Sequence, residues 1–347
     1  MSAVKQFEDA FAEYVGAKFA IALCNGTSTL HTALVALGVR PGDRVAVPPL
    51  TMSSTAIAVL HAGAVPVFVD VDPETWLINP HDTIDKMPPF QTPFGVPVSL
   101  YGLHGKWNSP YIVDDAAQTL RPYGGKYGGA NFVSYSFQAS KILPLGEGGM
   151  LVTNDEVLTT RAREFSSLGY RMPNGPVIDK RALKHPAYER HYSLGWNYRM
   201  SEQVARVGLL HFMGDTSPWM TPEGLLADRM VCANAYRDVV RDVEWLTPQH
   251  VPEGWGHDYW TYAVATDTPE RLLWLLDAVE RHGGERPYPA WLPFYLEPAY
   301  AAPFGMNVGT CPVAESLQPR LAQFQTNSLV SARQNANALR KAIAEAG

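Results

Sequence analysis

Residues 19–69 read FAIALCNGTSTLHTALVALGVRPGDRVAVPPLTMSSTAIAVLHAGAVPVFV, and this stretch decides the fold because apolar strands alternate in it with helical stretches. Gly38 ends the first helical stretch, and a turn at 41–43 separates it from the next strand. Alternation at this pace predicts a parallel sheet with helices on its faces. The predicted order is strand 19–23, helix 30–37, strand 44–47, helix 53–61 and strand 65–69.

The pattern continues to the middle of the chain, with one short connection. Further apolar strands are predicted at 96–100, 111–113, 131–137 and 150–152. Only residues 101–110 separate the first two of these, whereas a parallel crossover with its helix needs at least about 10 to 12 residues. We therefore expect no crossover helix there, and we expect the strand near Leu100 to meet an unusual loop or a neighbour in an oligomer.

The last third of the chain predicts a second, smaller unit. A helical stretch at 225–239 connects to it, and a strand at 260–264 and a helix at 271–281 follow. Residues 313–346 contain two further helical stretches. The predicted domains are a large one over 1–224 and a small C-terminal α/β domain over 225–347.

Composition excludes several classes of protein. Hydrophobic residues make up 46% and charged residues 18% of the 347 residues, which is the balance of a packed globular chain. The net charge of −6 does not fit a nucleic-acid-binding surface, and no apolar run approaches the roughly 20 residues of a membrane helix. The three cysteines are far apart, which argues against a disulfide framework or a zinc site and fits the cytoplasm. We expect no metal.

The first polar cluster, Asn25-Gly26-Thr27-Ser28, lies between a strand and the start of a helix. Free backbone N–H groups and the helix dipole favour an anion there, and two hydroxyls add donors. Simple N-capping by Thr27 or Ser28 is the alternative, and it is the more common use of such residues.

The second cluster follows the strand at 111–113 and contains Asp114, Asp115 and Gln118. A carboxylate at a strand end can pair with a buried cation, whereas an isolated Asp pair is more often a solvated turn or a helix cap. No histidine lies close in sequence, which weakens a metal site.

The third cluster is SYSFQASK, residues 134–141, followed by a glycine-rich loop at 146–149. Lys141 precedes the apolar pair Ile142-Leu143, and partial burial of its amine would lower the pKa and favour a Schiff-base nucleophile. A solvated surface cation is the alternative for an isolated lysine.

All three clusters follow predicted strands, and ligands bind at the carboxyl ends of strands in open α/β sheets. Together they suit pyridoxal phosphate, because its phosphate needs a helix N-terminus, its ring nitrogen a carboxylate and its aldehyde a lysine.

The sequence also resembles the DegT/StrS-type (DegT/DnrJ/StrS) sugar aminotransferases over nearly its whole length. The segments that carry the resemblance are NGTSTLHTALVALGVRPGDRVAVPPLT and AGAVPVFVDVDPET near the start, VDDAAQT at 113–119, YSFQASKILPLGEGGMLVTND at 135–155, GWNYRMSEQ at 195–203 and PVAESLQPRL at 312–321. The resemblance implies fold-type I, pyridoxal-phosphate-dependent enzymes that act as homodimers. Such enzymes move an amino group from glutamate or glutamine to a keto sugar, usually nucleotide-linked, with pyridoxamine phosphate as the intermediate form.

The resemblance also implies a role for individual residues. Lys141 would form the internal aldimine and carry the proton, Asp115 would pair with the pyridinium nitrogen, and Gln118 would approach the ring hydroxyl. The phosphate would be held by Gly26, Thr27, Ser28 and Ser136, with Asn197 reaching the partner subunit's phosphate and Arg199 nearby.

Several positions depart from the family pattern. Met52 stands where an aromatic ring usually stacks on the cofactor, and Gln323-Phe324-Gln325-Thr326 replaces a Leu-Pro-type segment. These changes leave the substrate open, and a keto cyclitol or a catalytically idle sensor are alternatives. Arg286 is the candidate for the donor carboxylate, and Tyr288 belongs to an aromatic loop that either stacks on substrate or lies in the dimer interface.

Overall fold

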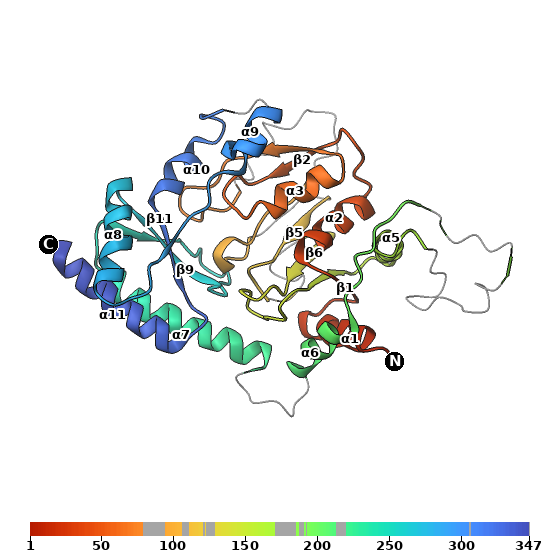
Figure 1. Cartoon of the computed structure of the whole chain (residues 1–347), viewed down its shortest axis with the longest axis horizontal. Coiled ribbons are helices and arrows are strands. Elements are labelled where there is room, and N and C mark those ends of the chain that lie inside the picture. Colours follow the sequence, from red (N-terminus) through yellow and green to blue (C-terminus); the bar gives the residue numbers. More distant parts are fainter. Residues whose placement is uncertain are drawn as a thin grey trace.

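The computed structural model describes most of the chain (Figure 1). The described residues are 1–78, 94–105, 111–120, 122, 129–170, 185–186, 191, 193–212, 220–304 and 307–346. No helix within these ranges is both long and apolar enough to cross a membrane.

Within the described residues, a four-stranded and a three-stranded sheet meet at the centre of the molecule. Three strands pair in parallel in the order β3-β2-β4, and four pair in the order β1-β7-β6-β5. Parallel bridges from Gly95 to Ile112 and from Val98 to Asp115 join β4 to β5. Only β7 runs against its neighbours, so the sheet is mostly parallel as predicted. The strands are β1 (Phe19–Leu23), β2 (Arg44–Val47), β3 (Val65–Phe68), β4 (Phe94–Gly95), β5 (Val113–Asp115), β6 (Phe132–Ser136) and β7 (Gly149–Thr153).

Helices cover both faces of this sheet because successive strand residues point to opposite sides. On β1, Ala20 and Ala22 pack with Phe7 and Phe11 of the first helix, whereas Ile21 packs on the other side in the cluster that holds the second helix. One face is covered by α1 (Ala3–Val15) and α6 (Glu202–Leu210), the other by α2 (Gly26–Leu37), α3 (Ser54–His61) and α5 (Glu156–Ser166).

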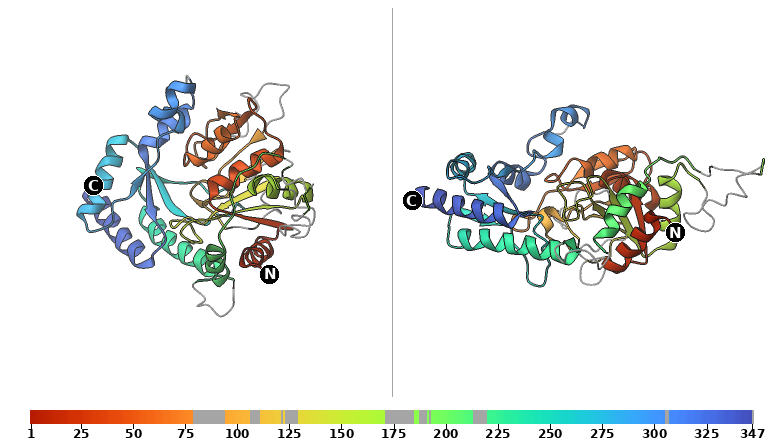
Figure 2. Two further views of the ribbon diagram at one scale, coloured as in Figure 1. Left: turned by 45° about the vertical axis from the view of Figure 1, so that its right-hand side comes forward. Right: turned by 60° about the horizontal axis from the view of Figure 1, so that its bottom comes forward.

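A second, antiparallel sheet with the order β10-β11-β9-β8 lies in the C-terminal part (Figure 2). Its strands pack against three helices around a core that contains Tyr236, Leu275, Phe324 and Leu339. The predicted boundary at residue 224 stays a prediction. The elements are α7 (Pro222–Val240), β8 (Leu246–Pro248), β9 (Thr261–Thr266), α8 (Pro269–Arg281), β10 (Tyr288–Pro289), α9 (Pro298–Phe304), α10 (Pro312–Leu317), β11 (Leu321–Gln325) and α11 (Leu329–Ala346).

The predicted strand at 96–100 is wrong in position. The paired residues are Phe94–Gly95, and a 3₁₀ turn, η1, occupies Leu100–Gly102. Pro97 has no N–H to donate, and beyond Gly95 a single bridge from Val98 to Asp115 continues the pairing. Tyr101 adopts a left-handed backbone with φ of 61°, so the extended segment ends before η1.

The connection after η1 contains no helix over residues 103–105, and residues 106–110 lie outside the described part of the chain. Leu103 forms an antiparallel bridge with His257, and the N–H of Asp258 donates to the carbonyl of Gly102 at 2.9 Å. Gly102 allows this close approach, because a Cβ there would lie 2.7 Å from the backbone nitrogen of Tyr259. A loop from the C-terminal part therefore covers this corner, which is one of the two outcomes expected from the short connection.

Candidate active site

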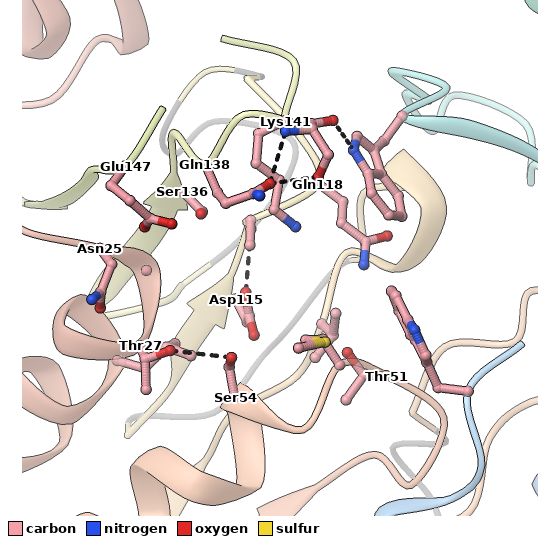
Figure 3. Close-up of a pocket in the computed structure, with 18 residues that line it drawn as sticks. Asn25, Thr27, Thr51, Ser54, Asp115, Gln118, Ser136, Gln138, Lys141 and Glu147 are labelled. Atoms are coloured by element: carbon pink, nitrogen blue, oxygen red, sulfur yellow. Dashed lines mark hydrogen bonds between the residues drawn. The ribbon is translucent and has the colours of Figure 1, made fainter. Parts of the chain in front are cut away.

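A cavity of about 410 Å³ opens at the carboxyl ends of β1, β5 and β6 (Figure 3). The three predicted clusters meet there, although long stretches of chain separate them in sequence. Of the residues singled out in the sequence, those that line the cavity are Gly26, Thr27, Met52, Asp115, Gln118, Ser136 and Lys141.

The first corner of the cavity is the N-terminus of α2. The Asn25 side chain caps the helix by accepting from the N–H of Ser28 at 2.8 Å. Gly26 lies against Ser136, and a Cβ on Gly26 would come within 2.9 Å of the Ser136 Cβ. The Thr27 hydroxyl donates to the hydroxyl of Ser54 at 3.1 Å. Helix N–H groups, the dipole and three hydroxyls thus surround a space that suits an anion.

Ser28 has the alternative role that the sequence left open. Its hydroxyl donates to the carbonyl of Asn25 at 2.7 Å and accepts from the N–H of the same residue at 3.2 Å. The side chain is buried and does not line the cavity. In the described structure it completes a capping box.

Asp115 ends β5 at the base of the cavity. The hydroxyl of Thr55 donates to its Oδ2 at 2.8 Å, and the N–H of Ala117 donates to its Oδ1 at 3.2 Å. Burial raises the pKa of Asp115, and these two donors together with the charge of Lys141 oppose that rise. A cation placed beside this carboxylate would relieve the cost of burying it.

Lys141 follows β6 in a tight turn. Its N–H donates to the carbonyl of Gln138 at 2.8 Å, and the Gln138 carboxamide oxygen accepts from the N–H of Ser140 at 2.7 Å. Burial lowers the pKa of the Lys141 amine, the charge of Asp115 opposes this, and the charge of Arg229 adds to it. The amine nitrogen lies 4.8 Å from the centre of the Trp260 ring. A lowered pKa increases the share of neutral amine, which is the nucleophilic form.

Gln118 links the cavity to the unusual turn at η1. Its carboxamide oxygen accepts from the N–H of Tyr101, the residue with the left-handed backbone. Gln118 is buried, so this bond fixes the side chain in place. Its expected contact with a ring hydroxyl stays a prediction.

Residues around the site that sequence reasoning missed include Ser54, Thr55, Arg229 and Trp260. The Arg229 guanidinium is buried and donates to the carbonyl of Trp260 at 2.7 Å and to the Thr326 hydroxyl at 3.0 Å, and it reaches the carbonyl of Lys141 at 3.4 Å. Burial lowers the pKa of Arg229 to about 10. A signal was present, because Arg229 shares the buried stripe of α7 with Cys232 and Tyr236. An arginine on such a stripe needs buried acceptors.

Five predicted site residues do not line this cavity, Ser28 and the four that follow. Asn197 and Arg199 are exposed on the segment after 193, as residues that serve a partner subunit would be, and their roles stay predictions. Tyr288 is 61% exposed and lines an adjoining cavity. Arg286 is the correction: its exposed guanidinium pairs with Asp277 and Glu280 of α8, so the structure does not bring it to the cavity.

The residues present fit pyridoxal phosphate. The missing Cβ at Gly26 leaves room beside Ser136 for a phosphate at the helix N-terminus. Asp115 and Lys141 offer the carboxylate and the amine that the ring nitrogen and the aldehyde require. Met52, which is 45% exposed, borders the same space with a polarisable thioether that can pack on a ring.

Comparisons with known proteins identify similar chains. The chain is 33% identical to "GDP-perosamine synthase" of Caulobacter vibrioides over 315 residues, which cover 86% of this chain and 78% of that protein. It is 33% identical over 223 residues to "Putative pyridoxal phosphate-dependent aminotransferase EpsN" of Bacillus subtilis, covering 59% of this chain and 54% of the relative. The solved structure of the aminotransferase from Psychrobacter cryohalolentis matches with a TM-score of 0.80 and 26% identity, over 99% of this chain and 91% of that one.

The model of the DegT/DnrJ/EryC1/StrS aminotransferase family matches residues 2–337. This match and the relatives confirm three predictions from the sequence: the fold-type I architecture, the aminotransferase activity and the pyridoxal 5′-phosphate cofactor. The chain belongs to the DegT/DnrJ/EryC1/StrS aminotransferase family.

Proposed function

We propose that this aminotransferase moves an amino group from glutamate or glutamine to a keto sugar that is nucleotide-linked. One observation carries the proposal: the Lys141 amine and the Asp115 carboxylate face the same cavity, with the α2 N-terminus beside them. The relative named GDP-perosamine synthase, which matches most of the chain, supports a sugar as the acceptor.

The chain's own residues divide the work of the reaction. When bound, pyridoxal phosphate supplies a carbonyl carbon for the lysine and a ring that delocalises the electron pair left on the donor after proton loss. Lys141 would accept that proton at Nζ and later give it back, for which its lowered pKa is suited. Asp115 would keep the ring nitrogen protonated, while Thr27 and Ser136 would hold the phosphate.

The active unit in this proposal is a homodimer. Leu194 is 95% exposed and Trp196 is 54% exposed, and they lie on the same segment as Asn197 and Arg199. Exposed apolar side chains of this size indicate a surface that another chain covers. Asn197 would then contact the phosphate bound by the partner. The proposed compartment is the cytoplasm, in keeping with three cysteines that lie far apart in the sequence.

The decisive test is loss of the lysine. We expect the protein loaded with pyridoxal phosphate to absorb visible light and to lose that band when glutamate or glutamine converts the cofactor to its pyridoxamine form. Lys141→Ala should bind the cofactor without the amine-dependent band and lower the rate of conversion at least about 10³-fold, since it removes both nucleophile and proton carrier. Lys341→Ala, on the exposed side of α11, is the matched control.

Two outcomes would contradict the proposal. A purified chain that takes up no cofactor would exclude the chemistry. A loaded chain whose spectrum stays unchanged with every amino donor would favour the idle sensor. Screening nucleotide-linked keto sugars against the pyridoxamine form then identifies the acceptor.

A further inference from the structure

A second cavity of about 310 Å³ adjoins the first and shares a wall with it. Ser140, Trp260 and Trp291 line both cavities. The shared wall is well fixed, because the Trp260 indole N–H donates to the carbonyl of Ser140 at 2.8 Å. Because these residues border both cavities, the second cavity lies directly beside the space around Lys141, next to a molecule that reacts there.

The floor of the second cavity is polar and uncharged. Side chains alternate along β11, so Gln323 and Gln325 face the cavity while Ala322 and Phe324 lie in the core of the small sheet. The Gln323 carboxamide donates one hydrogen bond to the carbonyl of Pro289 at 3.0 Å. Within the described part of the chain, the carboxamides of Gln325 and Asn327 make no hydrogen bond, and each offers donors and an acceptor.

Aromatic faces complete the walls. Tyr288 is 61% and Trp291 36% exposed, and Trp291 lies nearly parallel to Trp260 with an angle of 28° between the rings. The negative face of an aromatic ring attracts C–H groups that neighbouring oxygens polarise, as in a polyol ring. Large exposed rings beside free carboxamides form the usual lining of a small-molecule site.

Charge restricts the ligand. Among the described lining residues Arg229 is the one charged group, and its guanidinium is buried with its donors directed at Trp260, Thr326 and Lys141. A diphosphate in this cavity would lose its hydration without gaining a cation. A neutral ring with hydroxyl groups would exchange water for the carboxamides at little cost.

We propose that the second cavity is the subsite for the uncharged, hydroxyl-bearing ring of the acceptor, with Gln325 and Asn327 bonding its hydroxyls and Trp291 packing on its face. This rests on the proposed function, since it places the ring whose carbonyl reaches Lys141. A nucleotide diphosphate attached to such a ring would lie outside this cavity.

Saturation-transfer NMR on the cofactor-loaded protein tests the subsite directly. The ring probes are myo-inositol and methyl α-glucoside, and inorganic pyrophosphate is the anionic competitor. We expect both ring probes to receive saturation and pyrophosphate to leave their signals unchanged. Gln325→Leu and Asn327→Leu should each weaken probe binding about 3- to 10-fold, the value of one lost hydrogen bond. Asn337→Leu, exposed on α11, is the control.

Three results would overturn the subsite: no saturation of either probe, equal binding by wild type and both variants, or displacement of the probes by pyrophosphate. Asn327 is exposed and follows the end of β11, so Asn327→Leu should fold normally. This variant can therefore test the subsite even if Gln325→Leu does not fold. The donor-driven loss of visible absorbance is measured in parallel. If that conversion proceeds while the probes fail, the subsite alone is refuted, and if conversion fails, the proposed function is refuted.

Discussion

The glycine at the start of α2 offers the sharpest test of the phosphate corner. Gly26 has an ordinary right-handed backbone, so alanine there is tolerated by the helix, and alanine is favoured over glycine by up to about 1 kcal/mol. The added Cβ would lie 2.9 Å from the Ser136 Cβ and 3.1 Å from its hydroxyl. Carbon atoms pack at about 3.5–4.0 Å, so Ser136 must retreat by at least about half an ångström.

The surrounding backbone resists that retreat. Ser136 pairs with Gly149 across β6 and β7, and a Cβ on Gly149 would already lie 2.7 Å from the backbone of Asn25. The two strands and the start of α2 are thus closely interlocked, and overpacking in such a setting costs about 1–3 kcal/mol. The gain in helix propensity offsets part of this. We expect Gly26→Ala to lower the free energy of unfolding of the apoprotein by no more than about 2 kcal/mol.

Cofactor binding should suffer more than stability. The new methyl group and the displaced Ser136 hydroxyl both intrude on the space proposed for the phosphate. We expect the Kd for pyridoxal phosphate, measured by titrating visible absorbance, to rise about 10- to 100-fold, which corresponds to about 1.4–2.8 kcal/mol.

A matched glycine separates the two effects. Gly38 ends α2 with φ of 95° and has no heavy atom within 4 Å of an added Cβ. Gly38→Ala should therefore lower the free energy of unfolding by about 1–2 kcal/mol through backbone strain and leave the Kd unchanged. A Gly26→Ala enzyme with a Kd within about twofold of wild type would refute the placement of the phosphate at this corner.

Two further predictions concern charge and assembly. Because burial raises the pKa of Asp115 above its unfolded value of about 3.9, its contribution to stability is present below that value and is lost as pH rises through the folded pKa. Asp115→Asn should therefore stabilise the apoprotein relative to wild type, and urea unfolding at each pH should show that this gain grows between acid and neutral pH. The same variant should lower the aminotransfer rate at least about 10²-fold. A difference in the free energy of unfolding that does not change with pH would contradict the raised pKa of Asp115. For the homodimer, the Lys141→Ala chain and the Asn197→Ala chain should each be weakly active. Mixing them after mild dissociation should restore about a quarter of wild-type activity, because about half of the dimers are then mixed and one of the two sites in each receives both intact residues. No gain in activity on mixing would show that each chain builds its own site.

The parts of the site that could be predicted from sequence are those within one strand-to-loop segment. Asp115 and Lys141 each follow an apolar run that stops abruptly, and the rule that ligands bind at carboxyl ends of strands was enough to place them together. The same rule predicts the proposed phosphate site at the N-terminus of α2, although it does not say which of Thr27 and Ser28 faces the cavity. The N-cap is Asn25, with the Ser28 hydroxyl bonded back to its backbone and Thr27 left at the cavity, and this division of roles depends on side-chain geometry that the sequence does not contain.

The parts that could not be predicted depend on contacts between distant segments. Arg229 reaches Lys141 only because α7, β9 and the end of β11 converge, and β11 itself was hidden between two helical stretches. The guanidinium of Arg286 suits a donor carboxylate, but it already forms ion pairs with Asp277 and Glu280 on the adjacent α8. The apolar run at 96–100 misplaces the strand, because the pairing with β2 ends at Gly95, whereas a single bridge from Val98 to Asp115 continues it on the β5 side.

The electrostatics of the cavity connect stability to function. Burial raises the pKa of Asp115 and lowers that of Lys141, so the protein alone bears a cost for keeping both groups charged at neutral pH. Their mutual attraction offsets part of the cost. In the proposed function, a protonated ring nitrogen beside Asp115 would offset more, and a covalent bond from the neutral Lys141 amine would avoid the cost of burying its charge. Because these gains would exist only in the folded chain, we expect cofactor binding to stabilise the fold, chiefly through Asp115 and Lys141.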